Sequence, residues 1–185
     1  MSVQASSVQT LVSKLKEQTW VDLTHSFGPE SPRFPEFQPA EFKTLFTHAD
    51  GFFVKEYTFP GQYGTHIDPP VHFYKDDERY VEDLALKDLV LPLVVIDLHQ
   101  EVAENPDRSL TVKDIQAWEK KHGEIPAGSF VALRTDWGKR WPSQEKFENK
   151  DAHGQNHYPG WSLDALKYIY ETRHATANGH ETFDT

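Results

Sequence analysis

Two runs of apolar residues mark the interior strands that the chain predicts. Residues 89–98 are almost continuously apolar and indicate a buried central strand, and residues 128–135 indicate a second one. Between these runs, Thr111 and Asp114 have the spacing of a capping box, so we expect a helix over residues 111–123. A strand, a crossover helix and a second strand are typical of an α/β segment, here within a β-rich domain.

Shorter patterns complete the expected elements on either side of this segment. Residues 5–18 repeat apolar side chains at helical spacing and predict an amphipathic helix. We expect this helix to pack on its own domain, with an oligomer contact as the alternative. Residues 20–24 predict a short strand. Near the other end of the chain, Ser162 is placed to cap a last helix, and residues 175–178 begin a final strand.

A β-hairpin is expected between the first strand and the middle of the chain. Residues 41–48 and 52–59 have the composition of strands, and Ala49-Asp50-Gly51 between them has the chemistry of a hairpin turn. Phe42 and Phe46 are expected to share one face of the first strand. We interpret the aromatic rings of the hairpin as part of the core or of a pocket wall.

Composition restricts the class of protein. The 185 residues suit one domain with a sizeable core, and aromatic side chains supply much of its apolar surface, with 12 Phe, 7 Tyr and 5 Trp. A net charge of −10 argues against nucleic-acid partners and anionic membrane surfaces. The chain contains no Cys, which excludes disulfides and thiolate metal ligands. No apolar run resembles a membrane span or a signal peptide, so we expect a cytoplasmic protein.

The densest group of chemically useful side chains lies in residues 61–73. His66 and Asp68 form a His-x-Asp pair, and His72 follows after a Pro-Pro pair that forbids a continuing helix or central strand. An imidazole and a carboxylate could bind one metal ion there, with a second imidazole nearby to move protons. The alternative is that these are ordinary surface or hydrogen-bonded histidines, because a His-x-Asp pair often occurs by chance.

The spacing within this segment suggests how its side chains are presented. In an extended chain, alternate residues from Gln62 to Asp68 share one face. Gly64 has no side chain and leaves space between Gln62 and His66. We expect the Pro-Pro turn to bring His72 back towards the same face.

The segment resembles the signature of the metal-dependent cyclase/hydrolase family, which includes bacterial kynurenine formamidase and isatin hydrolase. The positions that match this signature are Gly64, Thr65, His66, Asp68, Pro70, His72 and Phe73. The likeness extends from about Asp22 to the end of the chain, through Asp22–His25, Leu133–Thr135, Tyr158–Trp161 and Gly179–Thr182.

The resemblance implies a fold and an assembly. The fold is the family's swivelling β/β/α type, an α/β domain with a mixed, partly barrel-like β-sheet and helices packed outside. Residues 1–185 would form a single cyclase-family domain, and a homodimer or homotetramer is expected. Family members usually continue past the position of Thr185 and bring a further His and Glu to the metal. We therefore expect the chain to lack its carboxyl-terminal part.

The resemblance also implies a metal-dependent hydrolase of a small amide or cyclic imide, which acts on C–N bonds other than peptide bonds. His66 and Asp68 would bind a divalent ion, zinc as the first expectation and manganese as the second, and the ion would acidify a bound water. The family's first ligand histidine falls on Gln62, whose neutral amide oxygen is a weaker ligand. His72 would act as the general acid and base, or alternatively would orient Asp68.

A binding module is the competing function. Because Gln62 stands where the family has a ligand histidine, the chain could bind a small aromatic or carboxylate ligand without hydrolysing it. A purely structural role is a third alternative. Aromatic residues near the signature would suit N-formylkynurenine or isatin, but such residues also fill ordinary cores, so the sequence does not identify the substrate.

Overall fold

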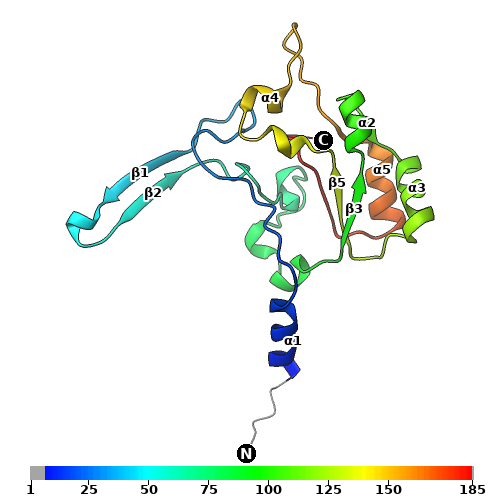
Figure 1. The fold of residues 1–185 in the computed structure, drawn as a ribbon, viewed down its shortest axis with the longest axis horizontal. Helices are drawn as coiled ribbons and strands as arrows, with labels where there is room; N and C mark the ends of the chain where they lie inside the picture. Colours follow the sequence, from blue (N-terminus) through cyan, green and yellow to red (C-terminus); the bar gives the residue numbers. More distant parts are fainter. Residues whose placement is uncertain (1–6, 185) are drawn as a thin grey trace, which may run out of the picture.

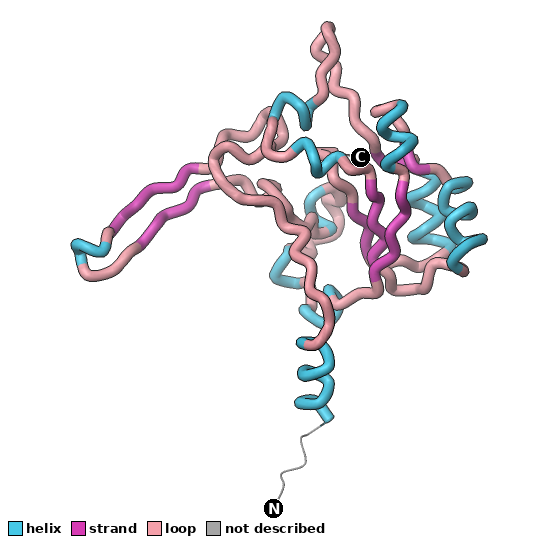
Figure 2. Tube along the Cα trace, in the orientation of Figure 1, coloured by secondary structure: helices cyan, strands magenta, loops and turns pink. Residues whose placement is uncertain are grey.

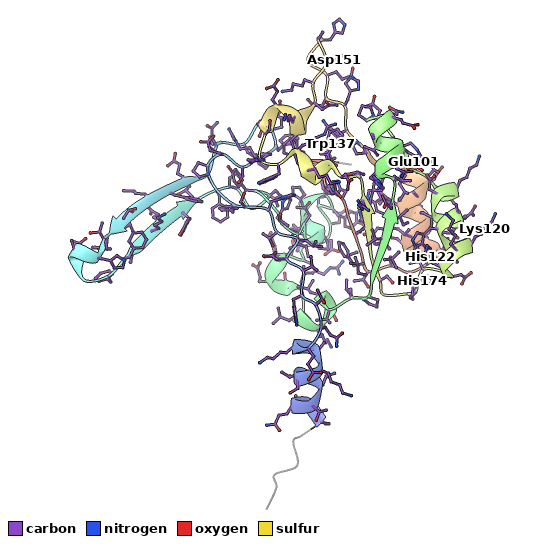
Figure 3. All side chains as sticks on the ribbon, viewed as in Figure 1. Glu101, Lys120, His122, Trp137, Asp151 and His174 are labelled. Carbon is purple, nitrogen blue, oxygen red and sulfur yellow. The ribbon has the colours of Figure 1, made fainter. Side chains whose placement is uncertain are left out.

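The structure is a computed structural model that describes residues 7–184 of the chain. A two-stranded arm and an amino-terminal helix project from a body that contains a three-stranded sheet and its helices (Figure 1). A long loop also leaves the body, with Asp151 near its tip, whereas Trp137 lies within the body (Figure 3).

Three parallel strands form the central sheet, in the order β3-β5-β7. They are β3 (Leu93–Asp97), β5 (Phe130–Arg134) and β7 (Ala177–Gly179). Because parallel strands run in the same direction, the residues that follow all three strands lie at the same end of the sheet, the carboxyl-terminal end of the strands.

Crossover connections join these strands. The helices and strands between β3 and β5 are α2 (His99–Glu104), β4 (Ser109–Leu110) and α3 (Val112–His122). Those between β5 and β7 are η5 (Trp137–Arg140), α4 (Gln144–Glu148), β6 (Gly160–Trp161), α5 (Leu163–Lys167) and the π-helical turn η6 (Tyr168–Thr172). The short strands β4 and β6 pair in parallel as a separate sheet.

Local capping signals place two of these helices as the sequence predicts. At the start of α3, the carboxylate of Asp114 accepts hydrogen bonds from the backbone N–H of Thr111, at 2.8 Å, and from its hydroxyl, at 2.6 Å. The helix ends before Gly123, which has a φ of 89°. At the start of α5, the Ser162 hydroxyl accepts a bond from the Ala165 N–H at 3.2 Å.

The main hydrophobic core takes all its buried members from residue 94 onward. It packs one face of β3 and β5 against α3, α5 and η6, and α3 and α5 lie beside the sheet in Figure 1. The same helices can be followed in cyan in Figure 2. The residues of this core are Val94, Ile96, Leu98, Val102, Leu110, Ile115, Ile125, Val131, Leu133, Trp137, Phe147, Trp161, Ala165, Ile169 and Ala175. Burial of this face is the main source of stability that the fold offers.

The expected buried strands agree only in part with the structure. Residues 128–135 contain β5, whose Val131 and Leu133 are buried, so that prediction is confirmed. Residues 89–98 were predicted to form a central strand, but β3 occupies only Leu93–Asp97 and lies at one edge of the three-stranded sheet. Its side chains alternate between buried and exposed, because helices cover one face only.

The region before this body contains four short elements in addition to the arm. They are the helix α1 (Ser7–Lys16) and the 3-10 helices η2 (Pro70–His72), η3 (Val81–Asp83) and η4 (Leu86–Leu89). Residues 5 and 6 of the predicted first helix lie outside the described residues. The helix is confirmed over residues 7–16, whereas residues 17 and 18 form a turn and a bend. It buries no residue, so the expectation that it packs on its own domain is wrong. No strand is found at residues 20–24, where the chain lacks a partner strand.

The predicted hairpin is present as the arm, with β1 (Glu41–Phe46) paired antiparallel to β2 (Val54–Thr58) through the 3-10 turn η1 (His48–Asp50). Its register shifts between Thr44 and Phe46. Phe42 pairs with Tyr57 before the shift, whereas Phe46 pairs with Val54 after it. Tyr57 and Val54 lie on opposite faces of β2, so Phe42 and Phe46 do not share a face as predicted.

The α/β class is therefore confirmed, while the finer fold type remains a prediction. Between residues 7 and 184 the structure has three small separate sheets, and none of them closes into a barrel. Over the same range, no helix is long and apolar enough to cross a membrane.

The one-sided core predicts different effects for two leucines of adjacent strands. Leu133 is 2% exposed and Leu93 is 54% exposed. We expect Leu133→Ala to lower the free energy of unfolding by about 2–5 kcal/mol, because it removes buried methyl groups and leaves a cavity. The matched control Leu93→Ala should cost roughly 1 kcal/mol or less. Urea unfolding of both variants measures this, and equal losses would contradict the one-sided core.

Candidate functional site

Residues 61–73 lead from the arm to η2 through turns and bends, without a strand. Gly64 has a φ of 69°, a left-handed conformation that interrupts an extended chain. The expectation that alternate residues from Gln62 to Asp68 share one strand face is therefore wrong. The side chains of this segment are instead positioned by turns and by tethers to the rest of the molecule.

Tyr63 provides the first tether. Its side chain is 2% exposed, and its hydroxyl donates to the carbonyl oxygens of Gly28, at 3.0 Å, and Pro29, at 3.2 Å. The ring of Phe27 packs edge-on against Tyr63, with 5.3 Å between ring centroids. A Cβ atom added to Gly64 would lie 3.1 Å from the Phe27 ring, so this close approach also requires glycine. Phe27, Gly28 and Pro29 thus fix the start of the segment.

A second tether reaches Thr65. The backbone N–H of His25 donates to the Thr65 hydroxyl at 3.1 Å. The His25 ring stacks on Trp141 with 4.4 Å between centroids, and the Trp141 indole N–H donates to the Ser26 hydroxyl at 3.1 Å. The segment is therefore connected through His25 to the region that follows β5.

The orientation of His66 leaves one ring nitrogen available as a ligand. Its Nδ1 lies 2.8 Å from the carbonyl oxygen of Gly64. Because a carbonyl oxygen can only accept, Nδ1 carries the hydrogen in this contact and Nε2 keeps a lone pair in the neutral ring. The same arrangement orients histidines that bind metals.

His66 Nε2 faces the carboxylate of Asp68, with 3.5 Å between Nε2 and Oδ1. When the imidazole is neutral, His66 Nε2 and Asp68 Oδ1 both carry lone pairs. A cation between them, either a proton or a metal ion, would therefore stabilise the pair. Two ligands at about 2.0–2.2 Å from one tetrahedral ion are roughly 3.4 Å apart. The pair therefore fits a divalent ion that takes nitrogen and oxygen ligands.

His72 returns to the same place after the Pro-Pro turn, as the sequence predicts. Its Nε2 lies 3.9 Å from Asp68 Oδ1. The side chains of His66 and His72 are each 31% exposed. A small molecule in solution can therefore reach both imidazoles.

Gln62 lines the same open hollow as His66 and His72. The hollow has a volume of about 570 Å³, and Tyr80 and Glu82 also line it. This volume lies in the range of about 300–1,000 Å³ that is typical of small-molecule sites. Among residues 7–184 the structure contains no cluster of three or more His, Asp or Glu side chains that could hold a metal ion. The candidate ligands are thus the His66–Asp68 pair, with the Gln62 amide in the same hollow.

His180 lies near the candidate site, although the sequence did not identify it. It directly follows β7, and it interacts electrostatically with both Asp68 and His66. Its Nδ1 lies 2.9 Å from the Thr182 hydroxyl, which orients the ring. His180 is exposed, but neighbouring protein atoms partly desolvate its imidazole, and this desolvation lowers the pKa of His180 below its ordinary value. The signal that could have found His180 is its position directly after a strand, because functional residues often follow the carboxyl ends of parallel strands.

The neighbouring Glu181 fixes the turn after β5. Its carboxylate accepts hydrogen bonds from the Thr135 N–H at 3.3 Å, the Thr135 hydroxyl at 3.1 Å and the Gly138 N–H at 2.9 Å. A Cβ atom on Gly138 would lie 3.2 Å from His25 Nε2. Glu181 therefore joins the end of β7 to Thr135 and Gly138, and Gly138 lies against the ring of His25.

Comparison with known proteins places these features in a family. The Cyclase family model, whose description is "Putative cyclase", matches residues 21–185. The chain is similar to isatin hydrolase from Roseibium aggregatum, with 38% identity over 184 residues that cover 91% of this chain and 69% of that protein.

Solved structures give the same result. Isatin hydrolase A from Labrenzia aggregata, bound to benzyl benzoate, has a TM-score of 0.88 and 32% identity over 97% of this chain and 75% of its own. An isatin hydrolase bound to the product analogue thioisatinate has a TM-score of 0.89 and 32% identity, over 99% of this chain and 74% of its own.

Gly64 and Gly61 offer a matched pair of substitutions. Gly64→Ala forces a side chain into a left-handed conformation, at a cost of roughly 1–2 kcal/mol, and brings it against Phe27. Gly61→Ala meets no atom within 4 Å. We expect amide hydrogen exchange in residues 61–73 to become about 5–30-fold faster in Gly64→Ala and to change little in Gly61→Ala. Equal exchange rates in the two variants would show that Gly64 is not required for this turn.

Proposed function

The chain belongs to the Cyclase family, and on this premise we propose that it is a metal-dependent hydrolase of a small amide or cyclic imide. It would act on a C–N bond other than a peptide bond. The observation that carries the proposal is the His66–Asp68 pair, with His66 Nε2 left free to bind and 3.5 Å from Asp68 Oδ1, in a chain 38% identical to an isatin hydrolase.

His66 and Asp68 would hold the divalent ion, with the Gln62 amide oxygen as the third protein ligand. Zinc is the first candidate because a nitrogen–oxygen ligand set suits it, and manganese is the second because oxygen ligands are numerous. When bound, such an ion supplies Lewis acidity, which polarises an amide carbonyl and makes water more acidic. Gly64 contributes through its carbonyl oxygen, which holds the tautomer of His66.

His72 is the proposed proton-transfer residue. It lines the hollow, and its Nε2 lies 3.9 Å from Asp68 Oδ1. From this position it would take a proton from the attacking water and then donate one to the leaving nitrogen, a role that suits imidazole because the ring can both accept and donate a proton. Asp68 beside it would stabilise the protonated ring.

We propose an aromatic cyclic amide of the isatin type as the first substrate to test. The relatives named isatin hydrolase support this class, and the ring of Tyr80 in the hollow could pack against an aromatic substrate. N-formylkynurenine is the second substrate to test. We also propose that the protein acts in the cytoplasm.

A binding module is the second candidate function. The neutral Gln62 in place of a ligand histidine favours it, together with the lack of a three-residue His, Asp and Glu cluster within residues 7–184. Such a protein would bind its ligand in the same hollow without metal.

Metal analysis separates these two functions. We expect purified protein to contain close to one equivalent of zinc or manganese per chain, and His66→Ala to lose it because the nitrogen ligand is removed. His153→Ala, which changes an exposed loop histidine, is the matched control and should retain the metal. Protein that takes up no zinc or manganese after incubation would contradict the hydrolase and favour the binding module.

The role of His72 can be tested once metal content is known. We expect His72→Gln to keep its metal and to lower kcat for isatin hydrolysis by about 10²–10⁴-fold, as removal of a general acid–base group does. If His72 only orients Asp68, the variant should instead lose metal affinity by about 10–100-fold. Full activity in a metal-loaded variant would exclude both roles.

A further inference from the structure

The hollow that holds His66 and His72 has a second wall, whose charge the proposed mechanism does not use. This wall is formed by Tyr80, Val81 and Glu82, at the start of η3. The rest of the lining comes from residues 61–72. A molecule that reaches the two imidazoles therefore enters a space that η3 also borders.

Local hydrogen bonds hold this wall against the site segment. The backbone N–H of Val71 donates to the carbonyl oxygen of Arg79 at 3.3 Å, which joins η2 to the chain that enters η3. The carboxylate of Asp83 accepts a hydrogen bond from the backbone N–H of Tyr80 at 2.9 Å and fixes the first turn of η3. The backbone on which this wall is built is thus tied to the site at both of its ends.

Most of the lining is apolar or neutral. Ile67, Val71, Tyr80 and Val81 supply apolar surface that suits an aromatic ring. Within residues 7–184 the aromatic rings of the arm belong neither to this lining nor to the main core, so our expectation that they form core or pocket wall is not met. Among the lining residues that the structure describes, Glu82 alone is acidic.

The carboxylate of Glu82 is not engaged elsewhere. Across residues 7–184 no group donates a hydrogen bond to it or forms an ion pair with it. The neighbouring acidic side chains differ, because Asp77 pairs with an arginine two residues later and Asp83 caps η3. Asp68 faces His66. Glu82 therefore brings a negative charge to the hollow without a compensating partner in the described chain.

The proposed reaction changes the charge of the molecule in the hollow. When a neutral cyclic amide is hydrolysed, its C–N bond breaks and a bond forms between the carbonyl carbon and the oxygen of water. One hydrogen of the water passes to the nitrogen. The new carboxylic acid releases the other as a proton, because such acids are ionised at neutral pH. The ring opens into one molecule, so a neutral substrate becomes an anionic product.

We propose that Glu82 is a specificity-determining residue, which lets the hollow accept a neutral substrate and disfavours the anionic product. This inference rests on the proposed hydrolase function. Like charges repel, and near a protein surface an exposed carboxylate weakens the binding of an anion by about 3–10-fold. The neutral substrate meets no such repulsion. Glu82 thus favours release of the product, a step that limits the rate of many enzymes.

The alternative is that Glu82 is an ordinary solvated side chain, since it is exposed. A chain of net charge −10 also repels an anion as a whole. A control must therefore separate the local charge from the net charge. Glu171 provides it, because this glutamate is exposed on η6 and does not line the hollow. Glu82→Gln and Glu171→Gln keep the side-chain size and change the net charge equally.

The test compares these two variants with the wild type. Initial rates of isatin hydrolysis give KM, and added isatinate, the ring-opened product, gives its inhibition constant Ki. We expect the ratio of Ki for isatinate to KM for isatin to fall by about 3–10-fold in Glu82→Gln and to keep the wild-type value in Glu171→Gln. Isothermal titration calorimetry with isatinate measures product affinity without turnover, and circular dichroism checks that both variants are folded.

Salt provides a second readout, which a change in the shape of the hollow would not move. Raising the salt concentration from about 0.05 to 0.5 M screens exposed charges. The ratio of Ki to KM in the wild type should then fall towards the ratio in Glu82→Gln, and the ratio in the variant should change less.

The outcomes separate this inference from the proposed function. An active wild type with equal ratios in the two variants would overturn the role of Glu82 and leave the hydrolase function standing. A ratio that falls equally in both variants would assign the effect to net charge and overturn the role as well. A wild type that does not hydrolyse isatin would overturn the isatin-type substrate, and this inference with it.

Discussion

The parallel pairing of β5 with both β3 and β7 is the constraint on which the rest of the structure depends. It brings the chain to the carboxyl-terminal end of the sheet after each strand. At that end of the sheet, Arg134 contacts Asp97 at 2.9 Å, and Glu181 holds the turn that follows β5. His180 interacts electrostatically with the site from the same end. Residues far apart in sequence thus meet there, and the sheet supports a site to which it contributes few side chains.

Local signals in the sequence account for the parts that were predicted correctly. The Thr111–Asp114 capping box and the Ser162 cap each specify a helix start through hydrogen bonds within four residues. The return of His72 towards Asp68 follows the stiff Pro-Pro turn between them. In such cases the interacting groups are neighbours in the chain, so the sequence contains the whole interaction.

The predictions that were wrong depended on contacts between distant residues. The face of Phe46 changed because of a register shift in the arm, which spacing within one strand does not reveal. The turn at Gly64 is shaped by the approach of Phe27, and His180 reaches the site only through the sheet order. An apolar pattern shows which side chains are suited to burial, but not which part of the molecule buries them. For this reason the pattern predicted the helix α1 but not that its apolar face is exposed.

The location of the main core has a consequence for how the molecule responds to its ligand. Every buried member of that core lies at or beyond Val94, whereas the candidate site lies in residues 61–73. The site segment therefore takes its order from individual contacts, such as the hydrogen bond from the His25 N–H to the Thr65 hydroxyl, rather than from the main core. A ligand that binds the hollow would add to these contacts and stabilise the folded protein by mass action, about 2.7 kcal/mol at a hundred times its dissociation constant.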